Sequence, residues 1–127
     1  MAKLIYSKTK VYFRDQWVPF SQANLSIASS PVLYGLSIYT VFNAIWNPKT
    51  KKLNVFRLQD HYKHLCNSAK IMDFKDFSKQ YSYQKFEKIM IDLLKKNRVQ
   101  EDALVRVTVF VDELIAGTKI HGLKNSM

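Results

Sequence analysis

The period of the apolar residues changes twice along this chain, and no other feature constrains the fold more strongly. Four early segments alternate or are rich in β-branched and aromatic residues, which indicates β-strands; they are Lys10–Phe13, Gln16–Phe20, Ile38–Trp46 and Lys52–Arg57. From Leu58 the apolar residues recur at helical spacing. A β-branched run returns from Ala103 to Val111. Strands, then two helices, then a strand predict an α+β fold: a mostly antiparallel sheet with two main helices on one face.

Both predicted helices have an apolar stripe, and the second has residues that suit its two ends. The first stripe consists of Leu58, Tyr62, Leu65, Cys66, Ala69 and Met72. The second consists of Phe86, Ile89, Met90, Leu93 and Leu94. Ser82 is a suitable N-cap for the second helix, and Asn97 is a suitable end for it. The sequence therefore predicts two amphipathic helices that each bury one face.

Turn residues divide the first half of the chain. Arg14-Asp15 and the segment 47–51 are expected to connect neighbouring strands. Pro31 suits the first turn of a short helix that ends or bends at Gly35. We also expect a short strand before Pro31, at Leu25–Ala28. The tail from residue 116 has no clear period.

Composition limits the setting of the chain. The 127 residues are enough for one domain, and the single cysteine, Cys66, allows no internal disulfide. The N-terminus lacks the apolar core of a signal peptide, and no apolar run is long enough to cross a membrane. A cytoplasmic protein without a membrane partner is expected. The net charge of +10 suits an anionic partner, but the lysines are scattered, which favours a solvated surface.

General cofactor motifs are missing from the sequence. Three glycines cannot form a glycine-rich phosphate loop, and no cysteine or histidine pair has zinc spacing. His61 and His64 are three residues apart on the first long helix. Without a third ligand we expect this pair to face solvent and to bind no metal.

Four strings of residues carry a resemblance to a known family. They are Tyr34-Gly35-Leu36-Ser37-Ile38-Tyr39, Val55-Phe56-Arg57-Leu58-Gln59-Asp60-His61, Leu65-Cys66-Asn67-Ser68-Ala69-Lys70-Ile71-Met72 and Leu104-Val105-Arg106-Val107-Thr108-Val109-Phe110. In this order they resemble the N-terminal small domain of class IV aminotransferases, which use pyridoxal phosphate. The Ser-Ala-Lys-Ile run is most similar to the branched-chain amino acid enzymes.

The resemblance implies roles for individual residues. Tyr34 and Tyr39 would belong to the substrate pocket, and Arg106 would position the substrate carboxylate, which an arginine fork suits. Each residue also has a structural interpretation: core packing for the tyrosines, and an ion pair with Asp60 or Glu113 for Arg106. His64 stands where the family has the arginine that holds the cofactor phosphate.

Several departures from the family weaken the implied site. Histidine lacks the permanent charge and the bidentate fork of arginine, so His64 would be a weaker phosphate ligand. Thr40 and Asn43 stand where the family usually has a glutamate and a basic residue. The family's cofactor is bound covalently to a lysine of a second, larger domain, and no lysine here matches it. Alone, the chain is therefore expected to be inactive and to hold no pyridoxal phosphate.

The sequence thus predicts a truncated or isolated small domain at 1–115, with 116–127 as the start of an interdomain connection. The large domain would be missing or supplied by another chain. Such a domain would expose apolar surface at Tyr34, Tyr39 and Leu114-Ile115, so a homodimer is expected. The alternative is a stand-alone basic α+β module that binds an anion such as RNA. No RNA-binding motif supports it, so a nucleic-acid partner is not expected.

Overall fold

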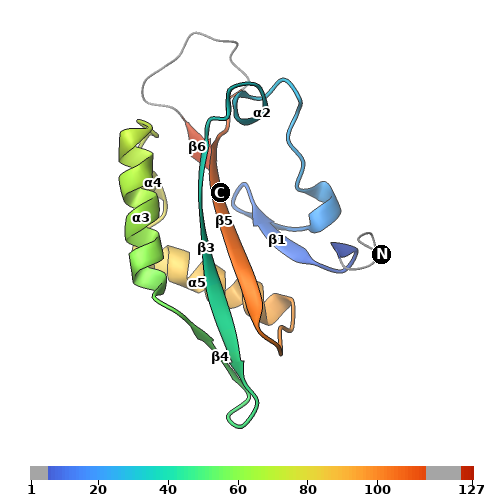
Figure 1. Ribbon diagram of the computed structural model, residues 1–127. Coiled ribbons are helices and arrows are strands. Elements are labelled where there is room, and N and C mark those ends of the chain that lie inside the picture. The colour runs from blue at the N-terminus through green and yellow to red at the C-terminus, as the bar shows by residue number, and fades with distance from the viewer. Residues whose placement is uncertain (1–5, 114–123) are drawn as a thin grey trace.

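A four-stranded antiparallel sheet organises the molecule (Figure 1). The computed structural model describes residues 6–113 and 124–127. The strand order is β4-β3-β5-β6, formed by β3 (Ser37–Asn47), β4 (Lys52–Val55), β5 (Ala103–Val111) and β6 (Asn125–Ser126). The two long strands pair from Ser37 opposite Phe110 to Ala44 opposite Ala103. Successive side chains of each strand point to opposite faces of the sheet.

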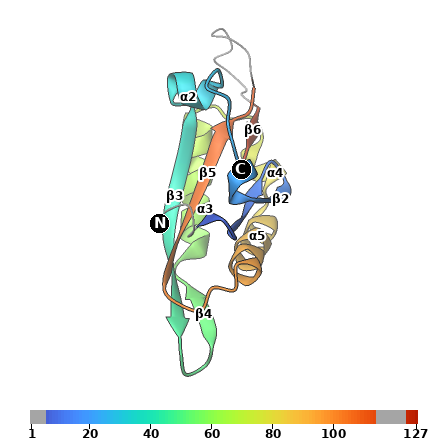
Figure 2. The same cartoon turned by 90° about the vertical axis from the view of Figure 1, so that its right-hand side faces the viewer.

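The remaining elements lie around this sheet. A separate hairpin consists of β1 (Lys10–Phe13) and β2 (Gln16–Pro19). The helices are α2 (Ser30–Tyr34), α3 (Leu58–Ile71), α4 (Phe77–Gln80) and α5 (Tyr83–Lys96). Figures 1 and 2 show α3 alongside β3, with the hairpin toward the other side of the sheet near α5. The α+β architecture expected from the sequence is confirmed, with an antiparallel sheet and helices packed on it.

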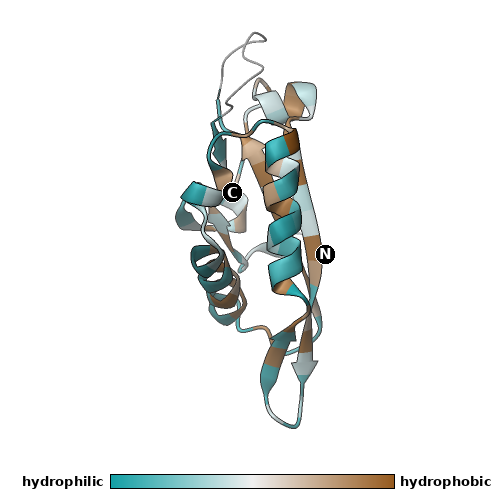
Figure 3. Ribbon diagram, turned by 90° about the vertical axis from the view of Figure 1, so that its left-hand side faces the viewer, coloured by the Kyte–Doolittle hydropathy of each residue, from teal (hydrophilic) through white to brown (hydrophobic). Residues whose placement is uncertain are grey.

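The core lies between the sheet and the helices. Alternate residues of β3 and β5 are buried there, including Phe42, Val107 and Val109. Leu65 of α3 and Phe86 of α5 have no exposed surface. Leu65 and Phe86 belong to the stripes that the helical period predicted, and burial of the core side chains is the main stabilising contribution to the fold. The surface of α3 that faces away from the sheet is largely hydrophilic (Figure 3).

Local signals set the ends of the helices. Gly35 has φ of 66° at the end of α2, a left-handed conformation that glycine adopts without a steric penalty. The Ser82 hydroxyl accepts a hydrogen bond from the Lys85 backbone N–H at 3.3 Å and caps α5. At the other end of α5, the Asn97 amide donates to the Leu93 and Lys10 carbonyls, both at 2.8 Å. Asn97 therefore ends the helix and also joins it to β1.

Three expectations about local structure were wrong. No strand forms at 25–28, because Asn24 and Ser26 hydrogen-bond to nearby backbone atoms and favour turns. A 3₁₀ helix, Phe20–Gln22, begins at the last residue of the predicted strand Gln16–Phe20. The return strand ends at Val55, since Arg57 adopts a left-handed φ of 51° that turns the chain into α3. Neither α4 nor β6 was anticipated.

Other expectations concern residues that the structure does not describe. The predicted boundary between 115 and 116 lies outside the described residues, and so do Leu114 and Ile115. Among residues 6–113 and 124–127, no helix is long and apolar enough to cross a membrane.

Candidate functional site

The side of the sheet opposite α3 presents an uncovered surface, which we call the open face. It consists of Tyr39, Val41, Asn43 and Ile45 from β3 and Leu104, Arg106 and Thr108 from β5. Strand register places Tyr39 opposite Thr108 and Val41 opposite Arg106. Leu104 is 74% exposed and Tyr39 is 54% exposed. Apolar side chains on a sheet face are normally buried against another layer, so this face is suited to contact with another surface.

Arg106 and Tyr39 form a defined pair on the open face. The guanidinium carbon lies 4.1 Å from the centroid of the tyrosine ring, which is a close cation–π contact. Its Nε donates a hydrogen bond to the Thr108 hydroxyl at 3.4 Å. Stacking uses the flat side of a guanidinium and leaves N–H donors along its edge. A carboxylate could accept hydrogen bonds from that edge.

The structure does not support the structural alternatives for these residues. Asp60 pairs instead with Arg57 at 2.7 Å, and the Lys124 backbone N–H donates to the Glu113 carboxylate at 3.0 Å. Arg106 forms an ion pair with neither acid among the described residues. Tyr34 is 55% exposed at the end of α2, so neither it nor Tyr39 is a core aromatic. Exposure alone does not assign either tyrosine a function.

A second cluster lies where α3 begins beside β3. The Thr40 hydroxyl and His61 Nδ1 are 2.7 Å apart and hydrogen-bonded. A cavity of about 410 Å³ lies here, lined by Thr40, Phe56, Arg57, Asp60, His61 and His64. The Arg57 hydrogen bond holds the pKa of the exposed Asp60 carboxyl below its ordinary value. Thr40 and His61 were not predicted to act together, although the sequence showed a threonine at the family's glutamate position.

The two histidines differ in their surroundings. His64 is exposed at the cavity, while His61 is half-buried with its ring 5.6 Å from that of Phe42. The expectation that both histidines face solvent was therefore wrong for His61. The helical turn that brings Leu58 and Leu65 onto the sheet also turns His61 toward β3. No cluster of three metal-ligating side chains occurs in the described part of the chain.

The two clusters share strand β3 but lie on opposite faces of the sheet. Tyr39 and Thr40 are consecutive in β3, so their side chains lie on opposite faces. β4 pairs only with Ala44–Asn47, which leaves the earlier part of β3 without a strand neighbour on that side among the described residues. The hydroxyl, imidazole and guanidinium groups of the cavity fit a phosphate group, although the Asp60 carboxylate partly offsets their charge. Residues 39 and 40 of β3 therefore belong to a carboxylate-compatible cluster on one face and a phosphate-compatible cavity on the other.

Known proteins are similar to this chain both in sequence and in fold. No family model matches the chain. A probable branched-chain-amino-acid aminotransferase of Synechocystis sp. is 28% identical over 114 residues, which cover 89% of this chain and 36% of the relative. A second, from Aquifex aeolicus, is 26% identical over 86% of this chain and 34% of its own length. The crystal structure of a branched-chain aminotransferase from Thermoproteus uzoniensis superposes with a TM-score of 0.82 at 26% identity, covering 92% of this chain and 38% of that protein.

The fold is that of the small domain of class IV aminotransferases. Within this class, the chain is a homologue of the branched-chain amino acid aminotransferases, matched over part of their length. It spans about a third of the curated relatives it matches. The resemblance seen in the four sequence strings is thus confirmed at the level of family and fold.

Proposed function

We propose that this chain acts as the small domain of a branched-chain-type aminotransferase and completes its active site together with a large domain. The observation that carries the proposal is the Arg106–Tyr39 pair, whose Tyr39 is next in β3 to Thr40 of the Thr40–His61 cavity. Amino-group transfer requires a carboxylate-binding group beside a cofactor-binding group. Residues for both tasks are present on adjacent positions of β3 and the elements that flank it.

Each side chain has a separate task in this proposal. Arg106 binds the substrate carboxylate through the edge of its guanidinium and fixes the orientation of the α-carbon. Tyr39 holds Arg106 in place and, with Tyr34, forms an apolar wall for the substrate side chain. The open face excludes water once a large domain covers it, which strengthens the ionic contact.

The cofactor of the family would have its phosphate end in the Thr40–His61 cavity. Pyridoxal phosphate, when bound, supplies an electron sink for labilising bonds at the substrate α-carbon. His64 and His61 would bind the phosphate, with His61 held in position by Thr40. The lysine that bonds the cofactor would come from the large domain, so the isolated chain is proposed to be inactive.

Association follows from the exposed surface. Apolar residues at α2 and on the open face, including Val32, Leu33 and Leu104, would otherwise remain in water. We propose that a large domain, and a second copy of the chain across a twofold axis, cover them. The cytoplasm is the proposed compartment, which suits the free thiol of Cys66. Light scattering of the purified chain tests the dimer, and a monomer at high concentration would contradict it.

A fusion enzyme tests the catalytic proposal. This chain is joined to the large domain of an active branched-chain aminotransferase, and leucine-dependent amino transfer to 2-oxoglutarate is measured. Arg106→Ala should raise the KM for leucine by about ten- to a hundredfold, the value of one or two ionic hydrogen bonds, and leave cofactor affinity unchanged. Lys70→Ala is the control, because Lys70 is exposed and lines neither cluster. Equal KM values for the two variants would refute the role of Arg106.

A further inference from the structure

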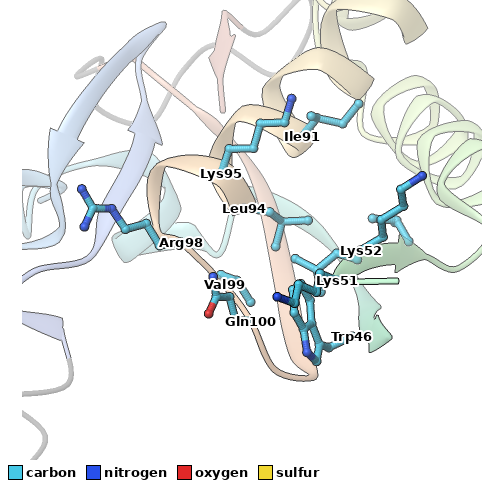
Figure 4. Close-up of a pocket in the computed structure, with 11 residues that line it drawn as sticks. Trp46, Lys51, Lys52, Ile91, Leu94, Lys95, Arg98, Val99 and Gln100 are labelled. Carbon is cyan, nitrogen blue, oxygen red and sulfur yellow. The ribbon is translucent and has the colours of Figure 1, made fainter. Parts of the chain in front are cut away.

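A second cleft lies away from both clusters of the candidate site. It is formed by the hairpin between β3 and β4 and by the end of α5, and it encloses about 490 Å³ (Figure 4). Its apolar lining includes Trp46, Leu53, Leu94 and Val99. Trp46 belongs to the helix side of the sheet, so the cleft does not open onto the open face. Its volume is that of a typical small-molecule site.

Cations surround this apolar lining. Lys51 and Lys52 come from the hairpin, and Lys95 and Arg98 come from the end of α5. Figure 4 shows these four side chains at the rim of the cleft, with the charged ends of Lys52, Lys95 and Arg98 pointing away from one another. No acidic residue lines the cleft, and all four cations lack a salt bridge within the described part of the chain. The cleft is therefore positively charged and apolar at the same time.

Two neighbouring acids lie outside the cleft lining and have partners of their own. Asp102 accepts a hydrogen bond from the Trp46 backbone N–H at 2.8 Å, and Asp92 pairs with Lys88 at 2.9 Å. No carboxylate lines the cleft itself, so its four cations are only partly compensated, and a bound anion adds to that compensation. The charge of the cleft is thus complementary to an anionic ligand.

Two of the four cations occupy unusual backbone positions. Lys51 has φ of 52° and Arg98 has φ of 50°, both in the left-handed region where glycine is less strained. Long charged side chains at such turns cost stability compared with glycine. Other charged residues of the chain also have positive φ, so this backbone conformation is not specific to the cleft.

We infer that this cleft binds a small organic anion with an apolar ring or hydrocarbon body. The body would lie against Trp46 and Leu94, and the long side chains of Lys51, Lys95 and Arg98 would turn toward its carboxylate, phosphate or sulfonate. Burial of the body supplies binding free energy, while the cations select for negative charge. This inference does not depend on the proposed aminotransferase role, because it uses none of the residues assigned to that role.

The test uses three probes and the two tryptophans of the chain. 1-Anilinonaphthalene-8-sulfonate combines an aromatic body with an anion, N-phenyl-1-naphthylamine has the same body without charge, and inorganic phosphate has charge without a body. Binding is followed by NMR at the indole N–H groups of Trp46 and Trp17. Trp17 is the internal control, since it stacks under Lys96 and does not line the cleft. We expect the sulfonate to shift the Trp46 signal and to bind about tenfold or more tightly than either other probe.

A pair of variants connects binding to the cations. The double variant Lys51→Gly/Arg98→Gly removes two charges at positions where glycine is less strained, so the fold should not lose stability. We expect it to bind the sulfonate about fivefold to tenfold more weakly. Lys70→Gln/Lys75→Gln removes the same charge from exposed sites outside the cleft and should leave affinity within about twofold. Equal losses in both variants, or equal shifts of Trp17 and Trp46, would overturn the inference.

Discussion

The carboxylate of Asp15 joins the β1–β2 turn to the helical layer, and its loss should weaken the whole fold. Its Oδ1 atom accepts hydrogen bonds from the hydroxyls of Tyr12 at 2.9 Å and Tyr81 at 3.0 Å. Lys85 Nζ lies 3.5 Å from the same oxygen. Tyr81 is completely buried between α4 and α5, so its hydroxyl has few other partners. One carboxylate therefore positions the hairpin against two helices.

Asp15→Asn is the appropriate perturbation. It removes the charge, keeps the size, and keeps a residue type that tolerates the left-handed φ of 61°. A hydrogen bond to a charged group contributes roughly 1.5–3 kcal/mol, and two are affected. The Asp15 side chain is 49% exposed, and the amide oxygen of asparagine can still accept hydrogen bonds from the tyrosines, so both effects reduce the loss. We expect the free energy of unfolding to fall by about 1–2 kcal/mol at neutral pH.

The pH dependence of this difference supplies a second check. Partial burial raises the pKa of Asp15, but the hydrogen bonds from Tyr12 and Tyr81 and the charge of Lys85 outweigh burial and leave the pKa below its ordinary value. A group with a lowered folded-state pKa stabilises the protein fully above its unfolded-state pKa. That contribution is lost as the pH falls through the folded-state pKa. The difference between wild type and Asp15→Asn should therefore shrink in acid.

Denaturant unfolding of both proteins at neutral and acid pH measures these effects. Asp76→Asn is the matched control: Asp76 also has a left-handed φ, of 53°, and it pairs with Lys79 on the surface. Its replacement should cost less than about 0.5 kcal/mol. The reasoning is refuted if Asp15→Asn is no more destabilising than Asp76→Asn, or if its effect is unchanged in acid.

Two further predictions concern the cofactor. The isolated chain, mixed with pyridoxal phosphate and reduced with borohydride, should show no stoichiometrically modified lysine by mass spectrometry; one uniquely modified lysine would contradict this. In the fusion enzyme, His64→Arg should tighten pyridoxal phosphate binding by about tenfold to a hundredfold, because it restores a permanent charge and a bidentate fork. Equilibrium dialysis measures that affinity, and an unchanged value would show that residue 64 does not hold the phosphate.

The sequence was sufficient for elements whose signals are local. Pro31 and Gly35 bracket α2, and Ser82 caps α5, because these residues act on the backbone next to them. The apolar stripe of α3 also needed only helical period. α4 was missed because its four residues, Phe77–Gln80, are too few to show a period, and it depends on burial of Phe77 in the core.

The residues of the candidate site could be identified from the sequence, but the contacts between them could not. The resemblance identified Arg106, Tyr39 and His64, and the period of the apolar residues placed the first two in β-strands and the third in a helix. Contact between Arg106 and Tyr39 depends on the β3–β5 register, which pairs residues far apart in the sequence. The hydrogen bond between Thr40 and His61 likewise requires α3 to pack on β3.

The sequence by itself determined the kind and order of the longer strands and helices and the family that the chain resembles. Both faces of β3 carry apolar residues, so alternation could not say whether the face of Phe42 or that of Val41 would be covered. The tertiary structure decided this when α3 and α5 buried the face of Phe42 and left Tyr39 and Arg106 exposed. It also gathered Lys51 and Lys95 around Trp46. Periodicity depends on neighbours along the chain, whereas a site depends on distances between segments that only packing sets.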